Sequence, residues 1–588
     1  MRAIVGLGVF LLLLSAPVAG QRGGGGGGGM PGGGGGMPGG GGQPMAVEAE
    51  QPAVPAEDLG SVEGNIYDAV SGVPLARAQL TMSSTSGGRR NRLTAVSDAA
   101  GRFRFPDVEP GQYTLTASRN LYASQTYGQS SGGGGTARII VARQQSVKSI
   151  NMKLQPAAVV TGRVLDEHGE PVPYARVSAS RYRYVNGARE MVSAGGSVTT
   201  DDRGEYRMFG LTAGKYYISV DYGTRLGPGF GGMRGGGQQQ QEADTAYPTL
   251  YWPSALDPAQ TAPIALRSGE ERGGVDFRLT QIQAVRVRGK VVLAEGGAAP
   301  RDTMVTLLPS GSGAFGASVQ RSNPINQTTG EFEVARVFPG SYILSATTRR
   351  STEGLYAREV LQVGGNDIDD LLVALRPGVS LAGVVRIEGA SPSDLSTESM
   401  RVSLMPTEAT GFRAGTASVD AAGSFEMQGL APGRYQMRIT RLPTNGYLKS
   451  ARLGDADALS NGMEIGSTVP GPVSLVVSLK AGLVTGAVFD DAKDPVPGAT
   501  VVLVPEQSKR NRMDLFQQAS TDQYGRFTLN GIAPGAYKLF AFGNVESGAY
   551  QDPVFLEPFE DDGEKIKVDE SGSAAVELKL LLVAGSGT

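Results

Sequence analysis

Apolar and polar residues alternate over short stretches along most of the chain, and turn-forming residues separate these stretches. Phe103 and Phe105 alternate with polar neighbours, and Tyr113 and Leu115 follow with the same period of two. This period is typical of strands that bury one face. No stretch shows the apolar period of a long amphipathic helix. The pattern predicts an all-β protein.

One hairpin pattern recurs five times. An Asp followed three residues later by Gly predicts a tight turn, because the Asp side chain accepts backbone hydrogen bonds and Gly tolerates positive φ. A second Gly, usually after Pro, stands 10 residues after the first, and a Tyr follows it by two. The glycines and tyrosines of the five copies are Gly101, Gly111 and Tyr113; Gly204, Gly214 and Tyr216; Gly330, Gly340 and Tyr342; Gly423, Gly433 and Tyr435; and Gly525, Gly535 and Tyr537.

The second half of each hairpin predicts a corner between two strands. Pro-Gly fits the central positions of a type II turn. The Tyr after it can bury its ring and hydrogen-bond locally, as in the tyrosine corner of Ig-like sandwiches. Two copies depart from the pattern, since the third has Gln327 in place of the leading Asp and the second has Ala213 in place of Pro.

A second signature lies about 40 residues upstream of each hairpin. It is a Gly between apolar residues, at Gly64, Gly162, Gly289, Gly383 and Gly486. A closing apolar strand follows each hairpin, so each unit holds roughly seven short strands in about 100 residues. We therefore predict five tandem seven-stranded Ig-like or transthyretin-like β-sandwiches. Their predicted bounds are 59–156, 157–281 with an aromatic insert, 282–377, 378–480 and 481–583.

The amino-terminal segment predicts export. Arg2 precedes the apolar run Phe10–Leu14, and Pro17 and Gly20 follow it, which is the order of a secretory signal peptide over residues 1–20. Residues 21–58 are rich in Gly and Pro and predict a disordered linker. Residues 584–588 form a short tail. We expect a periplasmic, cell-surface or extracellular protein without a membrane span in the mature chain.

The repeated unit resembles the carboxypeptidase regulatory-like domain. The resemblance is carried by the opening Gly-x-Val at Gly162 and Gly486, by Pro-Val-Pro-x-Ala from Pro171 and Pro495, and by the five hairpins. This family belongs to a transthyretin-like, carbohydrate-binding-like group that also includes B-type repeats of bacterial surface adhesins. The resemblance implies non-catalytic accessory modules, for which carbohydrate is the most plausible ligand class.

Composition narrows the chemistry further. The 588 residues include no Cys and one His, so thiolate chemistry and a multi-His zinc site are excluded. His168 stands in a turn and is expected to be exposed. The net charge of −3 does not suit nucleic-acid binding. We therefore predict no enzymatic activity, no catalytic residue, no metal and no cofactor.

Two clusters are candidate binding sites. The second repeat carries the only Trp and nine of the 20 Tyr. Aromatic faces backed by Arg donors suit sugar rings, although Trp252 could instead cover an open edge of the sandwich. The candidate carbohydrate-binding residues are Trp252, Tyr251, Tyr247, Tyr182, Tyr184, Arg181 and Arg183. Basic loops in the first and fifth repeats are candidate anion-binding sites or solvated loops: Arg89, Arg90 and Arg92, and Lys509, Arg510 and Arg512.

These features predict an exported, non-catalytic binding and spacer protein of the cell envelope, with polysaccharide or other envelope components as ligands. The alternative is an accessory partner of a separate secreted peptidase or outer-membrane transporter, which would bind protein by edge-strand addition. The sequence names no protein partner.

Overall fold

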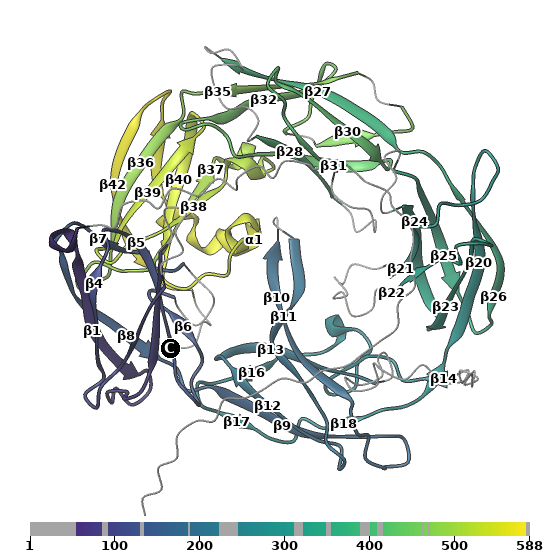
Figure 1. Ribbon diagram of the computed structural model, residues 1–588, viewed down its shortest axis with the longest axis horizontal. Helices are drawn as coiled ribbons and strands as arrows, with labels where there is room; N and C mark the ends of the chain where they lie inside the picture. Colours follow the sequence, from purple (N-terminus) through teal and green to yellow (C-terminus); the bar gives the residue numbers. More distant parts are fainter. Residues whose placement is uncertain are drawn as a thin grey trace, which may run out of the picture. The chain divides into compact units, whose positions relative to one another are not determined.

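The computed structural model describes residues 55–84, 92–129, 135–185, 188–222, 245–310, 321–348, 354–388, 400–407, 415–460, 462–468 and 471–583. The chain divides into two units, Met1–Ala53 and Val54–Thr588. The predicted signal peptide, most of the predicted linker and the whole tail lie outside the described residues. Strands dominate the second unit (Figure 1), and its only described α-helix is α1, Pro553–Leu556. The predicted all-β class is confirmed.

Residues 59–156 form two sheets, in the orders β4–β1–β8 and β3–β2–β5–β6, with β7 also paired to β5. The elements are η1 (Ala56–Asp58), β1 (Gly60–Asp68), β2 (Gln79–Ser84), β3 (Arg92–Val96), β4 (Arg102–Val108), β5 (Gly111–Ser118), β6 (Gln125–Thr126), β7 (Ile139–Val141) and β8 (Ser146–Leu154). β1 pairs antiparallel with β4 and parallel with β8. The closing strand thus returns alongside the first one.

Residues 157–281 repeat this plan with a longer hairpin and an insert. One sheet has the order β12–β9–β17, with β18 also on β9, and the other has the order β11–β10–β13–β15, with β16 also on β13. The elements are β9 (Ala158–Leu165), β10 (Arg176–Val185), β11 (Ala188–Thr199), β12 (Glu205–Leu211), β13 (Gly214–Asp221), β14 (Thr245–Ala246), β15 (Leu250–Tyr251), η2 (Pro258–Gln260), β16 (Ile264–Leu266), β17 (Glu271–Arg272) and β18 (Phe277–Arg278).

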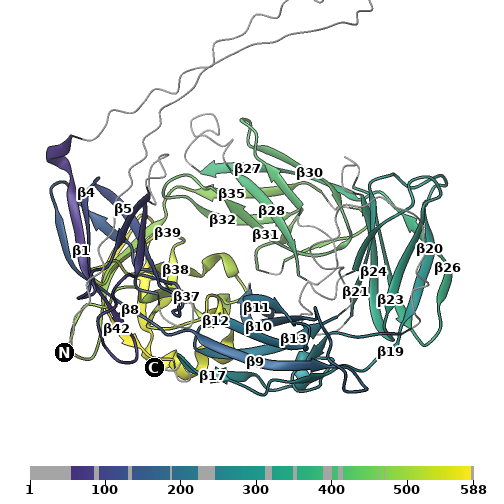
Figure 2. The ribbon, with the colours of Figure 1, turned by 60° about the horizontal axis from the view of Figure 1, so that its bottom comes forward.

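Residues 282–377 form a three-stranded sheet, β23–β20–β26, and a four-stranded sheet, β22–β21–β24–β25. Figure 2 shows these two sheets as separate layers. Val287, Leu307 and Phe332 lie in one buried apolar cluster between them. The elements are β19 (Ile282–Gln283), β20 (Val285–Leu293), β21 (Thr303–Pro309), β22 (Arg321–Pro324), β23 (Glu331–Val337), β24 (Gly340–Thr348), β25 (Tyr356–Val363) and β26 (Ile368–Leu375).

Residues 378–480 form the sheets β30–β27–β35–β32–β33 and β29–β28–β31–β34 around another buried cluster. Here the closing strand also pairs parallel with the first one. The elements are β27 (Val379–Glu388), β28 (Arg401–Pro406), β29 (Gly415–Ser418), β30 (Ser424–Leu430), β31 (Gly433–Thr440), β32 (Tyr447–Leu453), β33 (Ala456–Asp457), β34 (Met463–Ile465) and β35 (Val473–Ser478).

Residues 481–583 form one continuous sheet, β38–β37–β40–β42–β36–β39, with β41 also on β40. It is continuous because the closing strand β42 pairs with both β36 and β40. The elements are β36 (Gly482–Phe489), β37 (Thr500–Pro505), η5 (Gln507–Lys509), η6 (Met513–Leu515), β38 (Gln517–Ser520), β39 (Arg526–Ile532), β40 (Gly535–Phe542), η7 (Ala549–Gln551), α1, η8 (Glu557–Asp562), β41 (Glu564–Val568) and β42 (Ser573–Leu581).

This last segment buries both faces of its central strands. Val501 and Leu503 of β37 belong to one apolar cluster, and Val502 and Val504 belong to a second. The second cluster includes Leu556 of α1. The short helical elements therefore cover a strand face that would otherwise expose apolar side chains. The sequence reasoning did not anticipate this second layer.

Each group of strands has its own buried apolar cluster, which fits a chain of separate sandwiches. The exact bounds and number of the domains stay predictions. No helix of the described residues is long and apolar enough to cross a membrane.

The Asp–Gly turn of the hairpins forms as predicted. The Asp98 carboxylate accepts hydrogen bonds from the backbone N–H groups of Ala100 and Arg102, at 2.9 and 2.8 Å. Gly101 closes the turn with φ at 73°, and its N–H donates to the Asp98 carbonyl. A Cβ on Gly101 would stand 2.5 Å from the Ile66 carbonyl oxygen. Glycine is therefore required for both its conformation and the space it leaves.

In the third copy of the hairpin, the prediction that Gln327 takes the place of the leading Asp is wrong. Asn326, and not Gln327, takes the place of the leading Asp. Its side-chain oxygen accepts from the N–H groups of Thr328 and Thr329, and its carbonyl accepts from the N–H of Gly330. The turn holds one more residue here than in the other copies. The spacing of three residues between Asp and Gly therefore points to Gln327 in place of its neighbour Asn326.

The tyrosine corner is present in all five copies. The Tyr113 hydroxyl donates to the carbonyl of Glu109, four residues earlier, at 2.7 Å. The equivalent bonds join Tyr216 to Thr212, Tyr342 to Phe338, Tyr435 to Ala431 and Tyr537 to Ala533.

The predicted type II turn at Pro-Gly is wrong. Such a turn needs Gly at φ near 80°, whereas Gly340 and Gly433 have φ of 159° and 158°, which is extended backbone. These glycines instead begin the next strand. A Cβ on Gly340 would lie 3.5 Å from the Tyr342 ring, so the missing side chain leaves room for the corner tyrosine.

Glycine is needed at the upstream positions because the backbone of the closing strand passes close to them. A Cβ on Gly289 would stand 2.1 Å from the carbonyl oxygen of Leu371 on the closing strand. The pairing of β20 with β26 is irregular between Val287 and Gly289, which brings the two backbones together at this point. A Cβ on Gly486 would meet the Val576 carbonyl oxygen at the same distance of 2.1 Å.

Candidate binding site

The β10–β11 hairpin places the candidate Arg and Tyr residues of the second repeat in alternation. The ring of Tyr182 packs edge-on against Tyr217, with the ring centroids 5.2 Å apart. The Arg189 guanidinium lies 4.4 Å from the Tyr182 ring centroid, within the range of a cation–π contact. Tyr184 is half-buried and packs beside the apolar cluster that contains Phe542 and Leu556. These two rings therefore already have protein partners.

The arginines of this hairpin face an acidic group. Burial raises the pKa of the Glu546 carboxyl, while the positive charges of Arg181, Arg183 and Arg189 act in the opposite direction. Arg183 is exposed and Arg181 is half-buried. The positive charges of both candidate arginines thus act on Glu546.

The aromatic insert lies along the edge of β13. The backbone N–H of Trp252 donates to the Ile218 carbonyl at 2.9 Å, and the Thr261 hydroxyl donates to the Trp252 carbonyl at 2.5 Å. The half-buried Trp252 side chain packs against the apolar cluster of the second repeat. These contacts favour the alternative in which Trp252 covers an open edge of the sandwich.

The other two residues of the insert differ in exposure. Tyr251 is buried, and burial raises the pKa of its hydroxyl. The half-buried Tyr247 donates its hydroxyl to the Glu167 carboxylate at 3.1 Å and accepts from Gln281 at 3.2 Å. The insert therefore offers no row of free aromatic faces among these residues.

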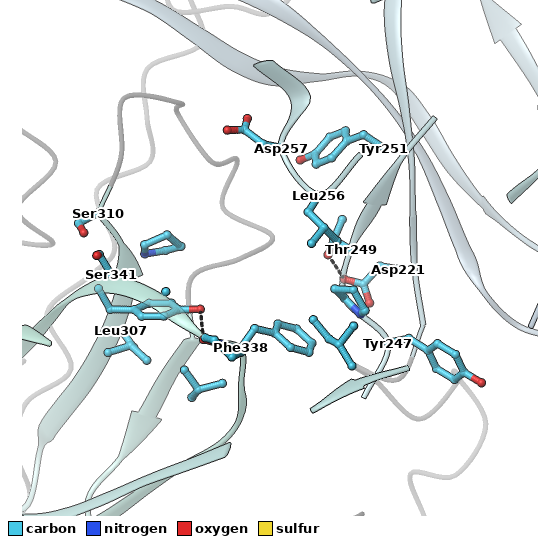
Figure 3. Close-up of a pocket in the computed structure, with 17 residues that line it drawn as sticks. Asp221, Tyr247, Thr249, Tyr251, Leu256, Asp257, Leu307, Ser310, Phe338 and Ser341 are labelled. Atoms are coloured by element: carbon cyan, nitrogen blue, oxygen red, sulfur yellow. Dashed lines mark hydrogen bonds between the residues drawn. The ribbon is translucent and has the colours of Figure 1, made fainter. Parts of the chain in front are cut away.

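The structure instead places Tyr247 and Tyr251 at a cavity of about 320 Å³ (Figure 3). One wall comes from residues 221–282 and the other from residues 307–342. The lining residues are Asp221, Tyr247, Pro248, Thr249, Tyr251, Leu256, Asp257, Ile282, Leu307, Pro309, Ser310, Val337, Phe338, Pro339, Gly340, Ser341 and Tyr342. We call it the Tyr251 pocket. Trp252, Tyr182 and Tyr184 are not among its lining residues.

The polar groups of the Tyr251 pocket are few and held in place. The Thr249 hydroxyl donates to the Asp221 carboxylate at 3.3 Å (Figure 3). Asp257 begins a short helical turn, and one of its carboxylate oxygens accepts from the Ala259 N–H at 2.8 Å. Figure 3 shows the Tyr247 hydroxyl pointing away from the pocket. The pocket thus combines apolar walls with two carboxylates and a few hydroxyls.

Sequence reasoning found two of these residues and missed the rest. Tyr247 and Tyr251 were selected by aromatic density alone. Asp221 and Asp257 carry no repeated pattern, and Phe338 belongs to a hairpin corner interpreted as purely structural. The only available signal for Phe338 was a large aromatic directly before Pro339, where the other copies have Glu109, Thr212, Ala431 and Ala533 at the corresponding position.

The basic loop of the fifth repeat is paired with carboxylates. Arg510 lies 2.5 Å from Glu560, and Arg512 contacts both carboxylate oxygens of Asp514 at 2.8 and 2.5 Å. Lys509 forms an ion pair with Glu506 at 2.7 Å. These partners compensate much of the positive charge that an anion would meet.

The equivalent loop of the first repeat is mostly undescribed. Arg89 and Arg90 lie outside the described residues, and Arg92 is exposed at the start of β3. Anion binding by either loop stays a prediction.

Asp166, Glu167 and His168 bring three ligand-type groups within 4.8 Å of one another. His168 is 78% exposed at its side chain, in agreement with the expected turn position. One Asp166 oxygen already accepts from the N–H groups of His168 and Glu170, as in an ordinary Asx turn. We assign no metal to this cluster.

The fold defines a class: repeated Ig-like β-sandwich modules, each built on a turn–strand–corner–strand hairpin. Three segments of the chain, residues 61–154, 159–228 and 483–572, match the family model of the carboxypeptidase regulatory-like domain. They lie in the first, second and fifth predicted repeats. The resemblance stated from the sequence is confirmed for these segments.

Solved structures of pilin and adhesin domains are similar to this chain at low identity. A streptococcal ancillary pilin is 11% identical, with 54% of this chain and 99% of that chain covered and a TM-score of 0.19. The minor pilin GBS52 of Streptococcus agalactiae is 12% identical, with 38% and 96% covered and a TM-score of 0.20. Two B repeat units of the collagen-binding protein of Staphylococcus aureus are 12% identical, with 71% and 99% covered and a TM-score of 0.12. At these scores the likeness extends to neither function nor arrangement. The comparison with curated proteins gave no match.

Proposed function

We propose that the chain is an exported, non-catalytic binding protein of the cell envelope, and that its ligand is a carbohydrate held in the Tyr251 pocket. The observation that carries this proposal is the composition of the pocket. Tyr251, Leu256 and Phe338 supply apolar surface, and Asp221 and Asp257 supply acceptors at its edge.

This combination suits a sugar for two reasons. The C–H faces of a pyranose ring are apolar and pack on aromatic and aliphatic side chains. Its hydroxyls donate hydrogen bonds, which carboxylates accept strongly. A cavity of about 320 Å³ lies at the small end of the range of ligand sites, so it suits one or two sugar residues at a chain end or side branch.

The direct experiment is a calorimetric titration of the mature full-length chain with soluble glycans and peptidoglycan fragments. Asp257→Asn preserves the acceptor oxygen for Ala259 but removes the charge. Phe338→Ala removes apolar surface from the opposite wall. We expect each variant to weaken binding about tenfold, which corresponds to about 1.4 kcal/mol.

Tyr174→Ala is the matched control, because Tyr174 is 76% exposed and does not line the pocket. It should bind as the unchanged chain does. Absence of binding to every glycan would refute the proposed ligand class. Full binding by both pocket variants would leave the class standing and refute the site.

A second candidate function is binding of a protein partner by edge-strand addition. It is favoured by β11, a twelve-residue strand that stands at the end of the strand order β11–β10–β13–β15. A stoichiometric protein partner recovered with the chain would support this function. Glycan retention without such a partner would support the first.

A further inference from the structure

Residues of the first predicted repeat contact residues of the fifth, 383 positions away along the chain. The Ile140 N–H donates to the side-chain oxygen of Gln523 at 3.1 Å, and the Gln523 side-chain amide donates to the Ile140 carbonyl at 2.8 Å. One glutamine side chain thus satisfies both backbone groups of a residue on β7. Since β7 pairs only with β5 among the described strands, Gln523 caps an otherwise open sheet edge.

Two further hydrogen bonds join the same segments. The Gln145 side-chain amide donates to the Tyr524 hydroxyl at 2.9 Å. The Gly135 N–H donates to the Thr500 hydroxyl at 2.8 Å. The first bond joins two side chains, and the second joins a backbone group of the first repeat to a side chain of the fifth, so both depend on the folded positions of the two repeats.

Glycines allow the two backbones to approach closely. A Cβ on Gly498 would stand 2.1 Å from the Gly128 carbonyl oxygen. A Cβ on Gly135 would stand 2.3 Å from the Ser520 hydroxyl oxygen, and its three nearest atoms all belong to Ser520 and Thr500. Beside them, Tyr127 is buried, and this burial together with the negative charge of Asp522 raises its pKa to about 12.

We propose that these residues form a specific intramolecular interface through which the first repeat binds the fifth. The partner is the same chain, because all the contacts occur within the single unit Val54–Thr588. The intervening chain raises the local concentration of one surface near the other, so modest contacts suffice to keep them together. One consequence is that the edge at Ile140 is closed to strands of other proteins.

The absence of native cysteine makes a direct test available. Arg138 and Thr528 are both exposed and line one gap between the two repeats. In the double variant Arg138→Cys and Thr528→Cys, a short bis-maleimide should join the two thiols rapidly. The pair Arg138→Cys and Val360→Cys is the control, because Val360 is 66% exposed in the third predicted repeat.

Gly135→Leu tests the interface itself. The three atoms nearest to the added Cβ belong to Ser520 and Thr500 of the fifth repeat, so the variant should lower the cross-linking rate of the 138–528 pair about tenfold while the circular dichroism spectrum stays unchanged. Gly364→Leu is the matched control, because a Cβ at Gly364 has no atom within 4 Å. It should leave the rate unchanged.

Three results would overturn the proposal. The first is equal cross-linking of the 138–528 and 138–360 pairs. The second is an unchanged rate with Gly135→Leu. The third is a cross-linked dimer from a mixture of the two single-Cys chains, since this would make a second copy the partner.

Discussion

The tyrosine corner of the fourth repeat offers a local test of how each hairpin is held. Tyr435 is buried, and its hydroxyl donates to the Ala431 carbonyl at 2.7 Å. Tyr435→Phe removes this one hydrogen bond and leaves the ring in place. A single intramolecular hydrogen bond contributes about 0.5–1.5 kcal/mol net. The corner should therefore open roughly two to twelve times more often in the variant.

Hydrogen exchange followed by mass spectrometry measures this opening in the full-length chain. Peptides from β30 and β31 should exchange faster in Tyr435→Phe by that factor, and peptides from the other repeats should not change. Tyr174→Phe is the control, because that exposed hydroxyl does not hold a corner. Unchanged protection in β30 and β31 would refute the role assigned to the hydroxyl, and faster exchange in every repeat would refute its local character.

Two further predictions concern the turns and the closing strands. Gly289→Ala places a Cβ 2.1 Å from the Leu371 carbonyl oxygen, so β26 must move. We expect this change to lower the stability of the third repeat by about 1–3 kcal/mol, measured by hydrogen exchange of its peptides. Gly364→Ala is the control and should have no effect, because a Cβ there has no atom within 4 Å. The hydrogen bond from the backbone N–H of Arg102 holds the pKa of Asp98 below its usual range. The ionised Asp98 carboxylate therefore stabilises the fold above about pH 4, and this stabilisation is lost as the pH falls through the pKa of Asp98 in the folded state. Asp98→Asn should abolish this acid-dependent loss in the β3–β4 hairpin, and an identical pH profile in the two proteins would contradict the assignment.

Much of the fold follows from spacing in the sequence, because each repeated residue answers a local need. The sequence separation from Asp98 predicts the turn glycine Gly101, and the separation from Gly111 predicts that Tyr113 forms a tyrosine corner. Both rely on contacts within a few residues, which sequence patterns record well. The Pro-Gly turn was misassigned because the same dipeptide fits a strand start when a tyrosine ring packs over the glycine.

The candidate site was less accessible to sequence reasoning. The Tyr251 pocket joins residues such as Asp257 and Phe338, which are far apart in the chain and carry no common pattern. Several of the aromatic residues around Trp252 pack on the sandwich itself, so their abundance in the sequence is not by itself evidence of a ligand site. The charge of the loop at Arg510 was visible in the sequence, but its partner Glu560 was not, because the pair forms only in the folded chain.

Pulling the full-length chain from both ends with an atomic-force microscope or optical trap tests the modular architecture most directly. Each sandwich should unfold as a separate event that releases about 100 residues, or roughly 330–360 Å of chain at full extension. Five such events are the predicted result, with a somewhat longer one for the second repeat. A single event that releases most of Val54–Thr588 at once would contradict the account.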